Sequence, residues 1–433
     1  MASNQARSVR NPSSSCADAS VLVWSSSRGP TRGESPSEAS QRGLDEPRRW
    51  RPRPSRRSAD PEAGTGDLGV KRPPLRVMDA SGSAEEIGAA HGRAHAAEIR
   101  AYTADRVGIV ASGVWTGAPL PAADVVDIAH SMIPAHESFD GDLHAEMVAM
   151  AEAAGVSPAE AIVVGGFTDF VDAVRAAAAN APSPAASEDD CTAVLVPDGR
   201  ADGAGFLAQT WDMHASATDH VLLLRVRPDG APAARLFTTA GCLGQIGMNS
   251  EGLCVGVNNL AGDDGRPGVT WPSVVRAMLK CSTAPEALEV LLGADLAGAH
   301  NYLILDRRGT GFNVEAMPSA RPVTALGHDP LVHTNHTLDA AAEAFQAERD
   351  PRLMRSSRAR LAAAADLLAA GRIDAERLFA LTREPTAICV TATPPFHIES
   401  SGAAVMRPRT GDFWACWGRP TENDFQRIEA CDG

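Results

Sequence analysis

The sequence predicts an α+β fold, and three patterns support that prediction. Over the N-terminal part, residues 74–190, apolar residues recur mainly at helical spacing. From Cys191 onward the period changes to two, and short apolar runs alternate with turn residues. Blocks of helical pattern then separate these strands within residues 191–433. Antiparallel strand runs flanked by helical blocks favour sheets packed between helices.

The first 73 residues differ from the rest. Residues 1–73 are rich in Ser, Arg and Pro, and carry 13 Lys and Arg against 8 Asp and Glu in a chain of net charge −14. They show no sustained helical or strand period. Such a segment buries too little apolar surface to offset the entropy of ordering, so we expect a disordered leader. A start codon assigned too far upstream is the alternative interpretation.

Residues 74–190 open with a predicted strand and continue as helices. The run from Leu75 to Gly82 predicts the strand, and Ser83 with Glu86 forms a capping box that opens the first helix. A second capping box begins at Ser157, with proline at the first helical position. Helices are expected over about 84–102, 122–138, 141–154 and 158–179. The Pro/Ser/Asp stretch that follows, up to residue 190, predicts an exposed loop.

Residues 191–433 are rich in strand patterns. Six short strands are expected in CTAVLV, GFLAQTWD, HVLLLRVRP, ARLFTT, LGQIGMN and GLCVGVNNL, and two more in HNYLILD and GFNVEAM. The last strands are predicted in TAICVTAT, AAVMRP and DFWACWG. Helices are predicted at about 271–281, 284–292, 338–348, 352–370 and 374–382. No internal repeat or linker divides residues 74–433, so both parts are expected to form one domain.

Composition excludes several classes of function. A net charge of −14 argues against nucleic-acid and anionic-membrane partners, and no apolar run reaches the ~18 residues of a membrane span. No GxGxxG or GxxxxGK motif supports a nucleotide cofactor. The eight cysteines include no CxxC pair, which predicts neither a metal site nor disulfides but reduced thiols in the cytoplasm. His91 and His95 have metal-ligand spacing without a third ligand, so a packed histidine pair is expected.

Three residues could carry chemistry. Cys191 stands where an acidic loop meets the first strand, and by itself it is best interpreted as a small buried hydrophobe. Asp212 ends the next strand, about twenty residues downstream. Asn335 follows the run LVH and could donate a hydrogen bond to a developing oxyanion.

The order of motifs resembles the isopenicillin N acyltransferase family, which consists of self-processing N-terminal-nucleophile (Ntn) hydrolases. The resemblance runs from about Leu75 to Phe425. It is carried by EEIGAAHGRAH, AEMVAMAEAAGVSPAEAIVVGGFTDF, CTAVLV, AQTWDM, AGCLGQIGMNSEGLCVGVNNL, HNYLILD with GFNVEA, LVHTNHTLD, TAICV and WGRPTENDF. It implies an αββα sandwich of two antiparallel sheets between helical layers.

The resemblance also implies a mechanism. The chain would cut itself between Asp190 and Cys191, leaving a heterodimer of its two fragments. The new α-amine of Cys191, with an ordinary pKa of ~7.7–8.0, would act as the base for its own thiol. Asp212 would orient that amine and Asn335 would hold the oxyanion. The substrate would be a small amide or acyl donor, and the acidic body favours a neutral or cationic one.

Two positions depart from the family pattern. Val390 stands where the penicillin-forming member has arginine, and Asp190 stands where that member has glycine. The resemblance also makes Trp211, Asn258 and His336 candidates for the pocket. Two alternatives stay open: a relative that lost its activity through Val390, and an uncut thiol hydrolase in which Cys191 uses the histidines that flank Asn335.

Overall fold

The computed structural model of the chain describes residues 75–177 and 190–431. The predicted disordered leader, residues 1–73, lies outside the described residues, as does most of the predicted loop before Asp190.

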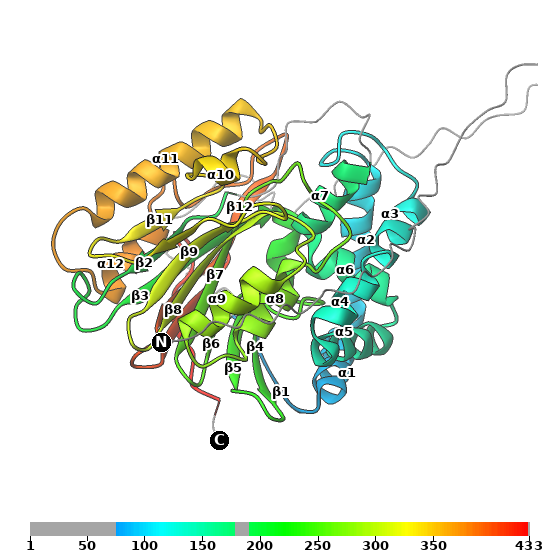
Figure 1. Ribbon diagram of the computed structural model, residues 1–433, viewed down its shortest axis with the longest axis horizontal. Coiled ribbons are helices and arrows are strands. Elements are labelled where there is room, and N and C mark those ends of the chain that lie inside the picture. The colour runs from blue at the N-terminus through cyan, green and yellow to red at the C-terminus, as the bar shows by residue number, and fades with distance from the viewer. Residues whose placement is uncertain (1–74, 178–189, 432–433) are drawn as a thin grey trace, which may run out of the picture. The chain divides into compact units, whose positions relative to one another are not determined.

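Two sheets form the centre of the molecule (Figure 1). The first has the order β1-β4-β5-β6-β7-β8-β9-β10, with bounds Val77–Gly82, Val221–Pro228, Ala234–Thr239, Ile246–Asn249, Leu253–Asn259, His300–Asp306, Gly311–Ala316 and Val323–Ala325. The second has the order β11-β2-β3-β12-β13-β14, with bounds Leu331–His333, Ala193–Val196, Phe206–His214, Ile398–Arg407, Asp412–Trp417 and Gln426–Arg427. Neighbouring strands are antiparallel except β1 and β4, which pair in parallel.

Helices cover the outer face of each sheet. The eight-stranded sheet is covered by the helices α1 to α9, with bounds Ala84–Ala94, Ala96–Ala111, Ala122–His130, Ile133–Phe139, Gly141–Ala154, Pro158–Gly165, Phe167–Ala177, Trp271–Met278 and Ala284–Gly293. The six-stranded sheet is covered by α11 (Pro351–Leu368) and α12 (Ala375–Thr382), with the short α10 (Ala340–Glu343) beside them. Strands β2 and β3 pack against β7 and β8 of the other sheet. The predicted αββα sandwich is therefore confirmed.

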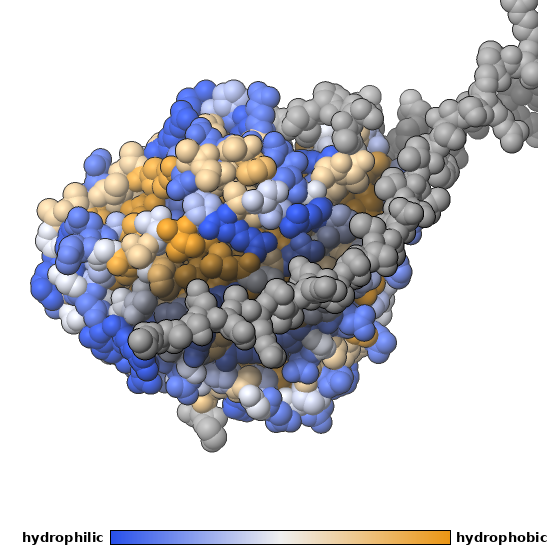
Figure 2. All heavy atoms as spheres, viewed as in Figure 1, coloured by the Kyte–Doolittle hydropathy of each residue, from blue (hydrophilic) through white to orange (hydrophobic). Residues whose placement is uncertain are grey.

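Side chains of β2 and β3 point alternately into two hydrophobic cores. Ala193, Leu195 and Leu207 belong to the cluster between the sheets, whereas Val194 and Phe206 pack under α11 and α12. Both faces of these strands are buried, which explains why β2 and the first three residues of β3 are continuously apolar. On the face shown in Figure 2, apolar residues gather over the strands and hydrophilic residues surround them.

Three predicted helices are interrupted. The helix expected over 122–138 is divided into α3, which ends at His130, and α4, which begins at Ile133. The helix expected over 84–102 breaks at His95, because α1 packs against α5 while α2 turns to pack against α6. The helix expected over 158–179 breaks at Gly166, where a Cβ would lie 2.4 Å from the side chain of Thr270. The breaks at His95 and Gly166 follow from packing partners that are distant in the sequence.

One predicted strand is wrong. The run TAICVTAT lies outside the sheets as a loop. The carboxylate of Glu384 accepts hydrogen bonds from the backbone N–H groups of Thr386, Ala387 and Ile388, so these donors need no neighbouring strand. The carboxylate of Glu384 thus accepts the hydrogen bonds that a neighbouring strand would accept in a sheet.

Within residues 75–177 and 190–431, no single helix has the length and apolar composition to cross a bilayer; only α5 and α6 taken together, across a bend of 104°, pass that test.

Candidate active site

Cys191 lies directly before β2, held beside β3. The backbone N–H of Thr210 donates to the carbonyl of Thr192 at 2.9 Å, and the N–H of Thr192 donates to the hydroxyl of Thr210 at 3.1 Å. This pairing brings the Cys191 thiol against the backbone of Asp212, whose N–H donates to Sγ at 3.4 Å. Only 1% of Cys191 is exposed. The sheet register therefore places the predicted nucleophile beside the predicted aspartate, buried in the uncut chain.

Arg360 lies at the centre of the site, and no motif in the sequence predicted it. Its guanidinium, fully buried on α11, donates to Oδ1 of Asp190 at 2.9 Å and to Oδ1 of Asn335 at 3.0 Å. It also donates to the carbonyl of Cys191 and, at 3.3 Å, to the hydroxyl of Thr192. One side chain therefore contacts both residues of the predicted cleavage site and the predicted oxyanion donor.

A signal for Arg360 exists in the sequence. The buried residues of α11 recur at intervals of three and four as Leu353, Ser357, Arg360, Ala364 and Leu368. Arg360 thus occupies the stripe that faces the sheet, where an unpaired arginine would be costly. An arginine in an apolar stripe indicates a buried anionic partner, although it does not say which one.

Asn335 follows β11 and is fixed by its neighbours. Its Oδ1 accepts from Arg360, which determines how the amide is turned, and its Nδ2 donates to the carbonyl of Asn259 at 3.0 Å. Its backbone N–H donates to the hydroxyl of Ser357 at 3.0 Å. An amide nitrogen carries two hydrogens, and Nδ2 of Asn335 has one acceptor, the carbonyl of Asn259, among the residues that the structure describes.

Asp212 is fully buried on the face of β3 that carries Thr210. Burial raises the pKa of its carboxyl to about 8, while hydrogen bonds from Ser400 and Thr210 and the charge of Arg360 oppose that rise. Its Oδ1 has no hydrogen-bond partner among the described residues. A buried carboxyl oxygen without a donor suits a site that acquires a cation at a later stage.

The raised pKa of Asp212 predicts how the stability of the uncut chain depends on pH. In a Cys191→Ala chain, the folded state binds the Asp212 proton up to about pH 8, whereas the unfolded state releases it near the ordinary value of 3.8. The free energy of unfolding therefore falls as the pH rises through this window, by ~1.4 kcal/mol for each pH unit. Urea titrations from pH 5 to 8 measure this slope, and adding Asp212→Asn should flatten it. Equal slopes in the two chains would contradict the assignment.

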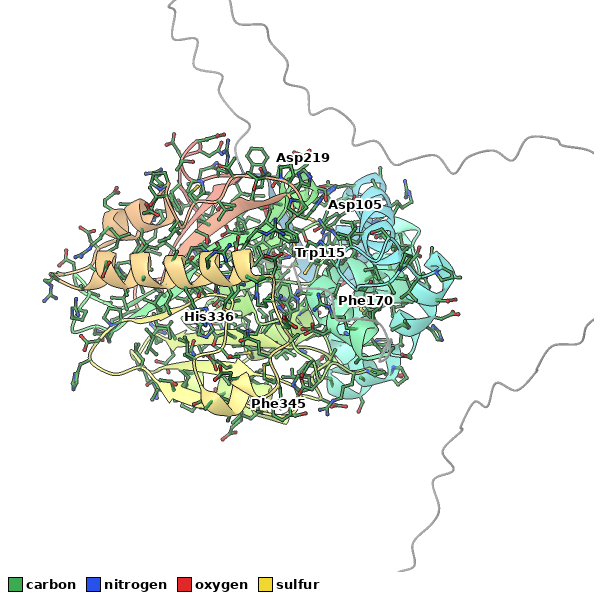
Figure 3. All side chains as sticks on the ribbon, turned by 90° about the horizontal axis from the view of Figure 1, so that it is seen from above. Asp105, Trp115, Phe170, Asp219, His336 and Phe345 are labelled. Carbon is green, nitrogen blue, oxygen red and sulfur yellow. The ribbon has the colours of Figure 1, made fainter. Side chains whose placement is uncertain are left out.

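The three pocket candidates lie in different surroundings. Trp211 is buried between the sheets with its ring edge toward Phe237. Asn258, at the end of β7, accepts from Asn301 at 3.4 Å, and its Nδ2 has no partner among the described residues. His336 lies beside α11 (Figure 3), where its Nδ1 is 2.7 Å from the hydroxyl of Ser357. Burial lowers the pKa of His336 to about 4.

Two other histidines that the sequence singled out, His333 and His91, have structural partners. Both ring nitrogens of His333 are engaged, one by the carbonyl of Thr334 at 2.7 Å and one by the carboxylate of Glu315 at 2.8 Å. His336 is therefore the histidine that an uncut thiol hydrolase would use. His91 accepts from the backbone of Gly241, and the residues that the structure describes contain no cluster of three metal-ligating side chains.

Val390 lies next to the site without a charge to contribute. Its N–H donates to the Ser400 hydroxyl at 2.9 Å, and the same Ser400 side chain hydrogen-bonds Asp212. Val390 cannot supply a positive charge, but another element does: Arg360 on α11 places a guanidinium at Asp190. Two surface cavities include none of these residues: one of about 350 Å³ between α1, α5, α8 and the β4–β5 turn, and one of about 590 Å³ between α4, α8 and α9.

Comparison with known proteins assigns the family. The family model described as acyl-coenzyme A:6-aminopenicillanic acid acyl-transferase matches residues 199–421, a little over half of the 433 residues. The chain belongs to this family. The match covers Asp212, Asn335 and Arg360 and begins after Cys191.

A relative and several solved structures resemble this acyl-transferase family member. The acyl-coenzyme A:6-aminopenicillanic-acid-acyltransferase 40 kDa form of Emericella nidulans is 28% identical over 156 residues, covering 35% of this chain and 42% of that protein. A variant of conjugated bile acid hydrolase from Clostridium perfringens has 14% identity and a TM-score of 0.35, covering 55% of this chain and 97% of its own. Penicillin V acylase from Agrobacterium tumefaciens has 11% identity and a TM-score of 0.32, covering 52% and 82%.

Proposed function

We propose that this chain is a self-processing N-terminal-cysteine amidohydrolase or acyltransferase that acts on small amides or acyl donors. The observation that carries the proposal is the single buried network in which Arg360 joins Asp190, Cys191 and Asn335, with Asp212 against the thiol. Membership of an acyl-transferase family supports the same class of chemistry.

Processing would be an N-to-S acyl shift. The Sγ atom of Cys191 attacks the carbonyl carbon of Asp190; the new C–S bond forms as the C–N bond to Cys191 breaks. The thiol proton ends on the Cys191 nitrogen, which becomes a primary amine. Water then hydrolyses the thioester, leaving a carboxylate on Asp190 and a thiol on Cys191. The products are two chains that stay together as a heterodimer.

Turnover would use the groups that processing creates. The α-amine of Cys191 takes the thiol proton, and the thiolate attacks the carbonyl carbon of an amide or thioester. The second N–H of the Asn335 amide stabilises the oxyanion, and Asp212, once ionised, pairs with the ammonium. The amine or thiol leaving group departs with a proton, and water or an acceptor amine resolves the acyl-enzyme.

The test of this proposal is the mass of the chains under denaturing conditions. Wild-type protein should yield two species that divide between Asp190 and Cys191, whereas Cys191→Ala should give one uncut chain. Cys242→Ala is a matched control, because Cys242 is equally buried and lies at a different place, against the carbonyls of Gly165 and Gly244. An uncut wild type without activity favours the impaired relative, and an uncut wild type with thiol-dependent activity favours the Cys–His alternative.

A further inference from the structure

Asp190, which departs from the glycine of the penicillin-forming family member, has a specific ion-pair partner. Its carboxylate forms an ion pair with Arg360 at 2.9 Å, and the two side chains are 7% and 0% exposed. Such a buried guanidinium is stable only with good compensation by hydrogen bonds and an anion. The other acceptors of Arg360 among the described residues are neutral: the Cys191 carbonyl, the Asn335 amide oxygen, and the hydroxyls of Thr192 and Ser356. Asp190 is therefore the anion that this arginine binds in the uncut chain.

Cleavage changes this charge balance. Once Asp190 is detached from Cys191, a substrate has to take the place of its carbonyl at the thiol. The site then holds the Arg360 guanidinium and the new Cys191 amine, with Asp212 as its remaining carboxyl. If the amine is protonated it pairs with Asp212, which leaves Arg360 without an anion. The local charge thus favours an anionic ligand, although the chain as a whole carries −14.

We propose that Arg360 is the specificity residue of the processed enzyme and binds a carboxylate on the acyl part of the substrate. Within Asp190 the carboxylate carbon is separated from the scissile carbonyl by two carbons, Cα and Cβ. A succinyl or aspartyl amide has the same spacing. Such a substrate presents its carbonyl to Cys191 and its carboxylate to Arg360, as Asp190 does in the uncut chain. This inference rests on the proposed function and names its substrate class.

Hydrolysis of such a substrate forms and breaks the same kinds of bond as processing. The Cys191 thiolate attacks the amide carbonyl of the succinyl group, the C–N bond breaks, and the amine leaves with the proton that the thiol gave to the α-amine. Water then cleaves the thioester and releases succinate. Arg360 forms or breaks no bond in these steps, but holds the distal carboxylate.

The test compares two fluorogenic amides of 7-amino-4-methylcoumarin, one carrying a succinyl group and one its neutral amide analogue. Processed wild type should prefer the succinyl compound in kcat/KM by about 10- to 100-fold, the range of a charge-assisted hydrogen bond. Arg360→Gln should bring the ratio close to one, and Arg360→Lys should retain part of it. Arg235→Gln is the control, since Arg235 is also buried but donates to the carbonyls of Ile428 and Gly411, away from the site.

A second measurement needs no variant. In processed wild type, succinate should slow the alkylation of Cys191 by iodoacetamide, whereas succinamide at the same concentration should not. Equal protection by both compounds, or a substrate ratio near one in wild type, would overturn the inference. If the chain is cut before Cys191 but hydrolyses only neutral acyl groups, only the role of Arg360 is refuted. If the chain stays uncut, the proposed function is refuted.

Discussion

Replacing Asn335 by alanine is expected to lower kcat of the processed enzyme by about 10²–10³-fold, the usual cost of losing one oxyanion donor. Asn335 is buried, its Oδ1 accepts from Arg360, and its Nδ2 donates to one carbonyl, that of Asn259, among the described residues, so we expect its second N–H to serve the reacting oxygen. Because this hydrogen bond strengthens as the carbonyl becomes an oxyanion, kcat should fall much more than KM changes. Steady-state kinetics on the cut protein measure the effect.

The control for this prediction is Asn249→Ala. Asn249 is also buried and donates through Nδ2 to backbone carbonyls, those of Leu279 and Cys281, but it lies at the end of β6, away from Cys191. It should reduce stability without a comparable loss in kcat. An Asn335→Ala enzyme that is processed and turns over at the wild-type rate would exclude Asn335 as the oxyanion donor.

The second large effect is expected from Arg360→Met in the uncut Cys191→Ala chain. Removing the guanidinium leaves the carboxylate of Asp190 buried without its cation, which typically costs ~3–5 kcal/mol of folding free energy. Adding Asp190→Asn removes the unpaired charge and should recover part of this loss. Urea titrations of the single and double variants measure the coupling between the two residues.

The pair Arg276 and Glu146 offers a matched comparison. It is equally buried, with N–O distances of 2.8 and 2.9 Å, and it joins α8 to α5 in the helical layer. Arg276→Met should destabilise the chain similarly, but Asp190→Asn should not rescue it. If the effects of Arg360→Met and Asp190→Asn simply add, the ion pair contributes nothing and its role at the cleavage site is refuted.

Local signals predicted most of the fold. The predicted capping boxes at Ser83 and Ser157 are both present in the structure, each with both of its reciprocal hydrogen bonds. The change of period at Cys191 marks the start of the sheet-rich part as expected. Local patterns did not predict the helix break at Gly166, because it depends on the distant residue Thr270. They also did not predict the loop after Glu384, because the apolar, β-branched run there predicts a strand, although a nearby carboxylate takes the place of a neighbouring strand.

The candidate site also contains residues that the sequence predicted and one that it did not. Cys191, Asp212 and Asn335 were found through the order of motifs, and the structure brings them into one buried network with Asp190. Arg360 was not predicted as a site residue, because it lies 170 residues from Asp190 in the chain, inside an alanine-rich helix without a motif. Only its position in the buried stripe of α11 indicated that it had a partner.

The proposed function requires that the backbone opens before Cys191 and gives its thiol a primary amine. N-terminal sequencing of the larger fragment, from purified protein incubated without protease, measures where the chain is cut. This fragment should begin Cys-Thr-Ala-Val, and Cys191→Ala should yield none of it. Active protein whose Cys191 remains linked to Asp190, or a fragment that begins at another residue, would contradict the proposed function.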